Sequence, residues 1–289
     1  APIGKVSNRW GWGFVSISVI MISVLVFIPM IQSFLLSLQS GQGNQLTFAG
    51  LSNYKRMLTD TTFRKALVNT FLYLLVQVPV MIILALFISV LLNDKKLKCR
   101  SFFRIAIFLP CVTSLVSYSL IMKSIFSGDG LVNQILMAMH LISEPIGWTT
   151  SPAFAKALII ISITWRWTGY NMIFYLSGLQ NIDPSIYEAA ELDGCNGFQK
   201  FFKIIVPQLK PIILFTTITS TIGTLQLFDE VKNITDGGPA NTTLTISQYI
   251  YNLCFKYTPN FGYAAAIAFV VLVMIAILSA IQMKVGGDD

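Results

Sequence analysis

The sequence predicts an all-α polytopic integral membrane protein with six transmembrane helices. Hydrophobic residues make up 54% of its 289 residues, and the mean hydropathy is +0.69. Charged residues make up only 11%, against roughly 25% in an ordinary soluble protein. Six apolar segments reach the roughly 20 residues that a helix needs to cross a bilayer. These observations exclude a disordered chain, a secreted disulfide scaffold and a soluble enzyme.

The six predicted spans are long and continuous and do not alternate apolar with polar residues, which favours helices over strands. Their approximate ranges are 14–38, 67–92, 102–126, 154–179, 204–228 and 261–283. Four spans contain a proline, and membrane helices tolerate proline where neighbours satisfy the freed carbonyl. We therefore expect kinks rather than helix ends at Pro29, Pro79, Pro110 and Pro211.

The distribution of Lys and Arg predicts the orientation. Residues 93–104 carry five of these cations beside a single acid, Asp94, whereas residues 127–152 carry none. The positive-inside rule places the first loop in the cytoplasm and the second outside, so both termini lie inside. The same bias accounts for the net charge of +7, and we expect no nucleic-acid partner.

One loop runs against this rule. Residues 39–65 are predicted to lie outside, yet they contain four cations interspersed with apolar residues. This pattern indicates a short amphipathic helix on the outer surface. The cations are Lys55, Arg56, Arg64 and Lys65, and the apolar residues are Leu51, Tyr54, Leu58 and Phe63.

The connection at 180–203 predicts a short cytoplasmic helix over about 184–194. Asp183 suits the N-cap, Pro184 suits the first helical position, and Gly194 suits the position after the helix end. Such a helix is about 15 Å long. From the residues alone it fits two interpretations equally: an ordinary interfacial loop helix, or a helix that docks into a partner protein.

The residues of this connection also carry a spaced motif. Glu188-Ala189-Ala190, followed by Gly194, Ile204 and Pro207, resembles the EAA motif of ABC importer permeases, with Val206 where the family prefers Leu. The resemblance implies a type I importer arrangement in which 184–194 is the helix that couples to a cytoplasmic ATPase. The implied coupling residues are Tyr187, Glu188, Ala189, Ala190, Asp193 and Gly194.

A second pattern resembles the carbohydrate subfamily of these permeases. It comprises Phe228-Asp229, Thr235, Gly237-Gly238-Pro239 and Thr243, together with the stretch 261–266 that opens the last predicted span. In that subfamily it marks the first of two paired permeases, of the maltose or lactose type. Compared with the larger maltose-type subunit, we expect neither the additional N-terminal spans nor the large external domain in residues 1–289. The resemblance implies a sugar cargo, and more narrowly an oligosaccharide.

Polar residues within the spans are candidate substrate contacts. Arg166 lies in the middle of the fourth predicted span, where a charge is costly, and Tyr170 follows one turn later. Arg166 fits either a structural ion pair or a cation that lines the translocation cavity. The resemblance implies substrate contacts at Tyr170, Ser220, Gly223 and Thr224. The two hydroxyl residues equally fit helix packing.

The remaining titratable residues suggest no further site. Asp229 and Glu230 lie near the external end of the fifth predicted span, where they would be solvated or would cap the next loop. Lys123 and Lys156 are expected to snorkel at outer span ends, and His140 is expected to be a loop residue. The four cysteines show no metal-binding spacing. We predict no catalytic residues and no metal site.

The chain contains no Walker A motif, so it cannot bind nucleotide phosphates by means of such a loop. ATP and Mg²⁺ are therefore expected on partner ATPase subunits. The resemblance implies a second homologous permease, two copies of the ATPase and an external substrate-binding protein. It also implies the cytoplasmic membrane of a bacterium. We treat residues 1–289 as a single transmembrane permease domain and expect no cleavable signal peptide at 11–27.

Three alternatives remain. An ion-coupled secondary transporter is disfavoured because no Asp, Glu or His lies near the centre of a predicted span. A membrane enzyme would need a cluster of titratable groups, and the acidic cluster at 183–193 belongs to the EAA match. Arg166 instead favours an importer with an anionic cargo, such as a uronate-containing oligosaccharide or a glycerol-phosphate-type ester. An amino acid is a further alternative cargo that keeps the ABC importer class.

Overall fold

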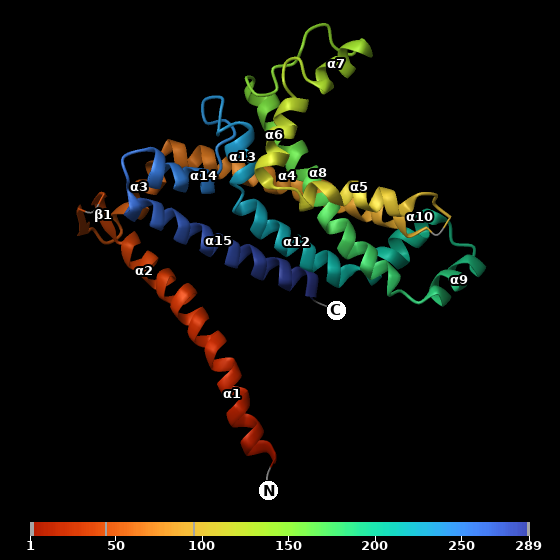
Figure 1. The fold of residues 1–289 in the computed structure, drawn as a ribbon, viewed down its shortest axis with the longest axis horizontal. Coiled ribbons are helices and arrows are strands. Elements are labelled where there is room, and N and C mark those ends of the chain that lie inside the picture. Colours follow the sequence, from red (N-terminus) through yellow and green to blue (C-terminus); the bar gives the residue numbers. More distant parts are fainter. Residues whose placement is uncertain (1–2, 44, 95, 288–289) are drawn as a thin grey trace. The chain divides into compact units, whose positions relative to one another are not determined.

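The computed structural model describes residues 3–43, 45–94 and 96–287, and it is mainly helical (Figure 1). The chain divides into two compact units. The first comprises Ala1–Asp60 with Ile250–Leu272, and the second comprises Thr61–Tyr249 with Val273–Asp289. Helices α14, Ile246–Tyr251, and α15, Phe261–Gly287, each contribute residues to both units.

The first unit begins with a long helix that corresponds to the first predicted span. Helix α1, Ile3–Ile22, continues through a π-helical turn, Ser23–Phe27, into α2, Ile28–Ser37. Pro29 lies in the first turn of α2 without ending the helix, as predicted. A two-stranded antiparallel hairpin follows, with β1 at Gln39–Gln42 and β2 at Gln45–Phe48. The sequence does not predict this hairpin.

Helix α3, Ser52–Thr59, confirms a short helix within the predicted amphipathic segment. It is shorter than predicted, because Asp60 has an extended backbone with ψ 107° and ends it. Helix α4, Thr61–Asn93, then starts before the predicted position 67 and takes up Arg64 and Lys65. Pro79 lies inside α4, so the prediction of a tolerated proline is confirmed.

The third predicted span is not one helix. Helix α5, Arg100–Val112, and helix α6, Leu115–Ile125, meet at an angle of 106°. Pro110 lies inside α5, and the chain changes direction at Thr113 and Ser114, which have extended ψ values of 151° and 135°. The prediction of a continuous helix with a kink at Pro110 is therefore wrong.

The fifth predicted span is also bent, by 70°. Its first limb runs through α10, Gly197–Lys200, a π-helical turn, Phe201–Ile205, and α11, Val206–Gln208. Its second limb is α12, Lys210–Leu225, with Pro211 in the first turn. Proline is favoured there because the first turn needs no intrahelical N–H donor. Pro211 thus begins a helix instead of kinking one.

Helix α8, Pro152–Gln180, packs along α4 and also contacts α5, α12 and the short helix α13, Asp229–Ile234. The second unit further contains α7, Leu131–Ala138, which contacts α6, and α9, Pro184–Leu192. Helix α8 also crosses α5 closely, because a Cβ at Gly169 would overlap the carbonyl oxygen of Ile107. Buried side chains of α4, α8 and the bend before α12, including Met81, Tyr175 and Leu209, form the core.

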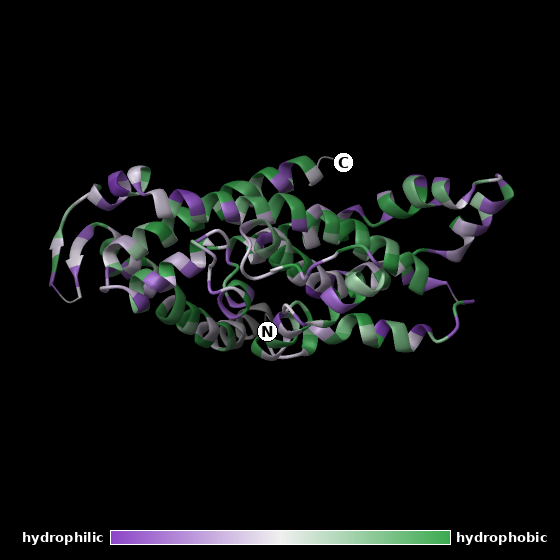
Figure 2. Ribbon diagram, turned by 90° about the horizontal axis from the view of Figure 1, so that it is seen from above, coloured by the Kyte–Doolittle hydropathy of each residue, from purple (hydrophilic) through white to green (hydrophobic). Residues whose placement is uncertain are grey.

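Three helices of the described chain are long and apolar enough to cross a membrane: Gly11–Ser37, α4 and α15. The number rises to five if each bent pair forms one span. Figure 2 shows these long helices as mainly hydrophobic ribbon, with hydrophilic residues concentrated in short helices and connections. Helix α8 has 29 residues but is not among these spans, and its sequence includes Lys156, Arg166 and Asn171.

Candidate functional site

Helix α9 has the local structure that its sequence predicts. The Asp183 carboxylate accepts a hydrogen bond from the backbone N–H of Ser185 at 2.9 Å, and Pro184 occupies the first turn. Gly194 has φ +73°, a left-handed conformation that favours glycine, and its N–H donates to the backbone carbonyl oxygen of Glu191. The predicted helix over about 184–194 is confirmed as Pro184–Leu192 with defined caps at both ends.

The two faces of α9 differ in what they contact. Ala190 is buried, and Tyr187 packs with Ile182 against the apolar core formed by α4, α8 and α12. Glu188 and Ala189 are exposed, and Leu192 is 89% exposed. The six residues predicted to couple therefore separate into two groups. Tyr187 packs against the bundle and Ala190 is buried, whereas Glu188, Ala189, Asp193 and Gly194 are exposed.

Hydrogen bonds stabilise the charged forms of two acids at this helix. The hydrogen bonds that Ser185 donates to Asp183, chiefly the one from its backbone N–H, lower the pKa of the Asp183 carboxyl below its ordinary value. Lys200 donates to Glu191 at 2.6 Å and likewise lowers the pKa of that carboxyl. Glu191 therefore already has a partner, whereas Glu188 and Asp193 project from the exposed side.

Arg166 is paired within the chain. Its Nη1 donates to Glu230 Oε1 at 3.2 Å, and the two side chains are only 12% and 5% exposed. Arg166 is the midpoint of α8, so α13 places a carboxylate beside the centre of this helix. Of the two roles expected for Glu230, exposure to solvent is wrong, because its side chain is buried beside Arg166. The short helix α13 turns the carboxylate inward.

Tyr170 belongs to a row of aromatic rings. Its ring lies 5.6 Å from that of Trp167 and 5.0 Å from that of Phe174, both in edge-on arrangements. Phe174 contacts Phe215 of α12 at 5.8 Å. Tyr170 and Phe174 are half-buried, and Phe215 is 53% exposed. Helices α8 and α12 thus present a partly open aromatic surface, which we call the aromatic row.

The predicted hydroxyl contacts lie within a helix interface. Thr224 donates to Gln77 Oε1 of α4 at 3.0 Å, and Ser220 Oγ approaches Met81 Sδ at 3.9 Å. Both side chains are buried, at 6% and 9% exposure. Gly223, by contrast, has no atom within 4 Å of the position that a Cβ would take. Of these three residues, only Gly223 has open space on its side-chain side.

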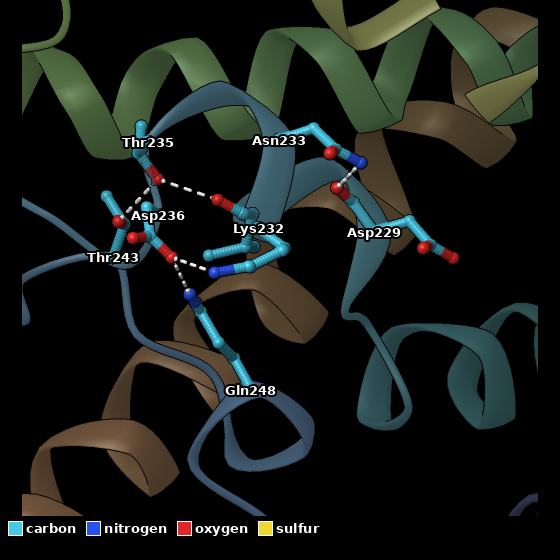
Figure 3. A network of polar contacts seen from close by, with 8 residues as sticks. Asp229, Lys232, Asn233, Thr235, Asp236, Thr243 and Gln248 are labelled. Atoms are coloured by element: carbon cyan, nitrogen blue, oxygen red, sulfur yellow. Dashed lines mark hydrogen bonds and ion pairs between the residues drawn. The ribbon is translucent and has the colours of Figure 1, made fainter. Parts of the chain in front are cut away.

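The segment from α13 to α14 is held by polar contacts (Figure 3). Asp236 accepts from Lys232 at 2.7 Å and from Gln248 at 3.1 Å, and the hydroxyls of Thr235 and Thr243 are 2.8 Å apart. Thr235, Gly237 and Thr243 belong to the second sequence pattern, and Gly237 has φ +80°. This pattern therefore specifies a rigid loop. Among the described residues, no cluster of His, Cys, Asp and Glu could hold a metal ion.

A family comparison identifies the chain. Residues 99–285 match the family model described as the binding-protein-dependent transport system inner membrane component. The chain belongs to this family. It is a permease, the membrane transport subunit of such a system, and not an enzyme.

Among curated proteins, the permease is similar to the lactose transport system permease protein of Rhizobium radiobacter. The two are 56% identical over 274 residues, which cover 94% of this chain and 92% of the relative. It is 36% identical to the arabinooligosaccharides transport system permease protein of Halalkalibacterium halodurans, over 91% of this chain and 83% of the relative. The identification as a binding-protein-dependent ABC permease is thus confirmed.

Among solved structures, the permease resembles a chain of a bacterial ABC transporter involved in the import of alginate. The TM-score is 0.83 at 21% identity, over 98% of this chain and 97% of that chain. An amino acid ABC transporter gives a TM-score of 0.54 at 18% identity, covering 81% and 97%. At these identities the likeness shows the fold, which is that of ABC importer permeases.

The roles of three residues of the permease are not predicted from the sequence. Glu230 lies 64 positions from Arg166, and the cost of burying the Arg166 charge was the one signal that an acid lies nearby. Gln77, in the middle of α4, was a polar residue in an apolar span and carried a comparable signal. Leu192 is the exposed apolar residue of α9, and its position four residues after Glu188 places both on one face.

Proposed function

We propose that the permease is one of two homologous membrane subunits of an ABC importer that moves an oligosaccharide across the bacterial cytoplasmic membrane. The observation that carries the cargo class is the 56% identity to a lactose permease over nearly the whole chain. In this proposal the chain spans the membrane six times with both termini inside. The spans are 11–37, α4, the pair α5–α6, α8, the limbs of 197–225, and α15.

The aromatic row is the proposed sugar-contacting surface. The C–H faces of a sugar ring pack against aromatic rings, and Tyr170 also offers a hydroxyl for hydrogen bonding. The free space at Gly223 fits a ring that lies against α12. Ser220 and Thr224, which already bond or pack against α4, are proposed to hold α12 in place and to meet the sugar only if α12 moves.

The proposed cargo is uncharged. An anionic cargo would need a free cation in the cavity, whereas the charge of Arg166 is balanced by Glu230 at 3.2 Å. The alternatives of a uronate-containing oligosaccharide and a glycerol-phosphate-type ester depended on a free Arg166.

The exposed face of α9 is the proposed coupling surface. It presents Glu188, Ala189 and Leu192 to a cleft of a cytoplasmic ATPase, which holds ATP and Mg²⁺. Tyr187 attaches α9 to the bundle, so a movement of the ATPase is transmitted to α4 and α8. Rigid-body movement of this kind alternates the access of the cavity between the two sides. The remaining partners are a second permease, a second ATPase copy and an external binding protein.

The test is the ATPase activity of the complete complex in lipid, stimulated by its binding protein loaded with sugar. Neutral and uronate-containing oligosaccharides are compared in wild type and in Arg166→Met/Glu230→Met, which removes both charges together. We expect stimulation by neutral sugars in both proteins. Stimulation by acidic oligosaccharides alone, lost in the double variant, would overturn the uncharged cargo. Absence of stimulation by every sugar would overturn the sugar proposal itself.

A further inference from the structure

A basic cavity of about 530 Å³ lies in the second unit, apart from α9 and from the aromatic row. Its walls are the first two turns of α4, the second turn of α8 and the loop 240–242. Three cations line it: Arg64 and Lys65 from α4, and Lys156 from α8. In the described part of the chain, none of the three forms an ion pair.

The cations of α4 lie near the helix N-terminus, where positive charge is unfavourable. Arg64 and Lys65 lie near the N-terminus of a 33-residue helix with no acid in its first turn. The helix dipole places partial positive charge at this end, so two cations there repel the helix terminus as well as each other. An anion in the cavity would relieve both repulsions, which makes the site complementary to negative charge.

The loop that forms the third wall is fixed in place. Asn69 of α4 donates to the carbonyl oxygens of Asn241 and Leu244 at 3.3 and 3.0 Å. Tyr73 donates to the carbonyl oxygen of Thr243 at 3.3 Å, and Thr70 accepts from the N–H of Ile246 at 3.2 Å. The cavity is therefore preformed, and an anion that binds there need not order the loop.

An apolar track leads away from the cavity along α4. Val68 and Leu75 follow Arg64 at four and eleven residues, so the three share one helix face, and Val68 and Leu75 are 57% and 71% exposed. The distance from Arg64 to Leu75 along the helix is about 16 Å, close to half the thickness of the hydrocarbon core. Since α4 is long and apolar enough to span, its first turns lie at headgroup depth.

We propose that this cavity binds the phosphate headgroup of an anionic phospholipid, with an acyl chain along Val68 and Leu75. The cations balance the phosphate, and the apolar track covers the chain. The alternative occupant, an acidic side chain of a partner protein, makes no use of this track. The proposal does not rest on the cargo of the permease, only on α4 spanning the membrane.

The test is native mass spectrometry of the purified complex after exchange into detergent with added phosphatidylglycerol. The variant R64Q/K65Q/K156Q is compared with the matched control K96Q/K98Q/R100Q, which removes three cations from a different connection. We expect wild type and control to retain the lipid, and the cavity variant to retain at least tenfold less. Equal retention in all three proteins, or equal loss in both variants, would overturn the proposal.

Two further arms identify the occupant. Adding inorganic phosphate to the delipidated complex, followed by calorimetry, is expected to give no saturable binding, because the free ion has no acyl chain. Saturable phosphate binding that the cavity variant loses would overturn the assignment to a lipid. Affinity for the binding protein, measured in zwitterionic nanodiscs, is expected to be equal in wild type and cavity variant. A tenfold loss there with normal lipid retention would assign the cavity to a protein carboxylate.

Discussion

The ion pair between Arg166 and Glu230 joins two charges, each of which would cost free energy of folding if it were buried without a partner. Both side chains are nearly buried, and removing one partner of a buried pair typically costs about 3–5 kcal/mol because the other charge stays buried and unpaired. Glu230→Gln is therefore expected to lower the thermal unfolding temperature of the complex clearly. The measurement is a melting curve of the complex in detergent.

The matched control is Glu191→Gln, because Glu191 also pairs with a cation but is 70% exposed. Exposed ion pairs contribute little to stability because water screens them, so this variant should melt close to wild type. Arg166→Met/Glu230→Met should recover most of the loss, since neither charge remains. Equal melting temperatures for Glu230→Gln and Glu191→Gln would contradict the account of a buried pair.

Tyr170 provides a second prediction for a single side chain. Tyr170→Ala removes a ring from the middle of the aromatic row. We expect the maximal rate of ATP-driven uptake to fall severalfold, because ring stacking contributes about 1 kcal/mol, and the KM for sugar-loaded binding protein to change little. Tyr170→Phe keeps the ring and should behave nearly as wild type. An unchanged maximal uptake rate in Tyr170→Ala would remove this residue from the sugar path.

At this scale the sequence predicts which residues are unusual better than it predicts what they contact. Arg166 is recognisable because a charge in an apolar segment is costly, but its partner lies in a six-residue helix beyond the next long segment. Ser220 and Thr224 have spacing that fits one helix face, yet spacing does not tell whether that face meets a cavity or α4. Contacts between distant segments decide both questions.

Among the elements, α9 yields a prediction from its C-terminal glycine. Gly194 has φ +73° and open space around its Cβ position, so the backbone conformation alone restricts the residue. Gly194→Val should misplace the end of α9 at a cost of about 1–2 kcal/mol, whereas Gly194→Asn, which tolerates this conformation, should be mild. We expect ATP-driven uptake to fall severalfold in the first variant only, with normal assembly in both. Equal uptake would contradict a coupling role for this end of α9.

The N-cap of α9 gives a pH prediction. The pKa of Asp183 is lowered in the folded protein, so the cap is fully formed above the ordinary pKa and is lost as the pH falls through the lowered value. Hydrogen exchange of a peptide covering 184–192 should therefore show a loss of protection at acid pH, after correction for intrinsic rates. Asp183→Asn should keep the cap without this dependence, because its amide oxygen still accepts the bond. The same acid-induced loss in Asp183→Asn would contradict the assignment.

Helical elements were predictable, whereas bends were not. Apolar runs locate segments 102–126 and 204–228, but hydropathy does not report the direction of the backbone. The first bend lies at Thr113 and Ser114, three residues after the proline that suggested a kink, and neither residue is a strong helix breaker. The caps of α9, in contrast, depend on neighbouring residues alone, so Asp183, Pro184 and Gly194 were assigned correctly.

For the whole molecule, the surfaces left uncovered agree with a subunit that works in a larger assembly. The apolar window within Gly11–Ser37 has none of its residues buried, so lipid or another subunit must cover this helix. The exposed Leu192 of α9 is likewise uncovered by the chain itself. The family, and with it the need for a binding protein, was predictable from two spaced motifs. The cargo depends on residue contacts and was predictable only as a class.

The proposed role of α9 is to couple ATP hydrolysis on a partner to the movement of a sugar through this permease. The most direct measurement is ATP-dependent uptake of a labelled neutral oligosaccharide into proteoliposomes holding the complete complex and its binding protein. We predict uptake in wild type, and normal assembly with near-complete loss of uptake in Glu188→Lys/Leu192→Asp, which alters only the exposed face of α9. Wild-type uptake in that assembled variant would contradict the account.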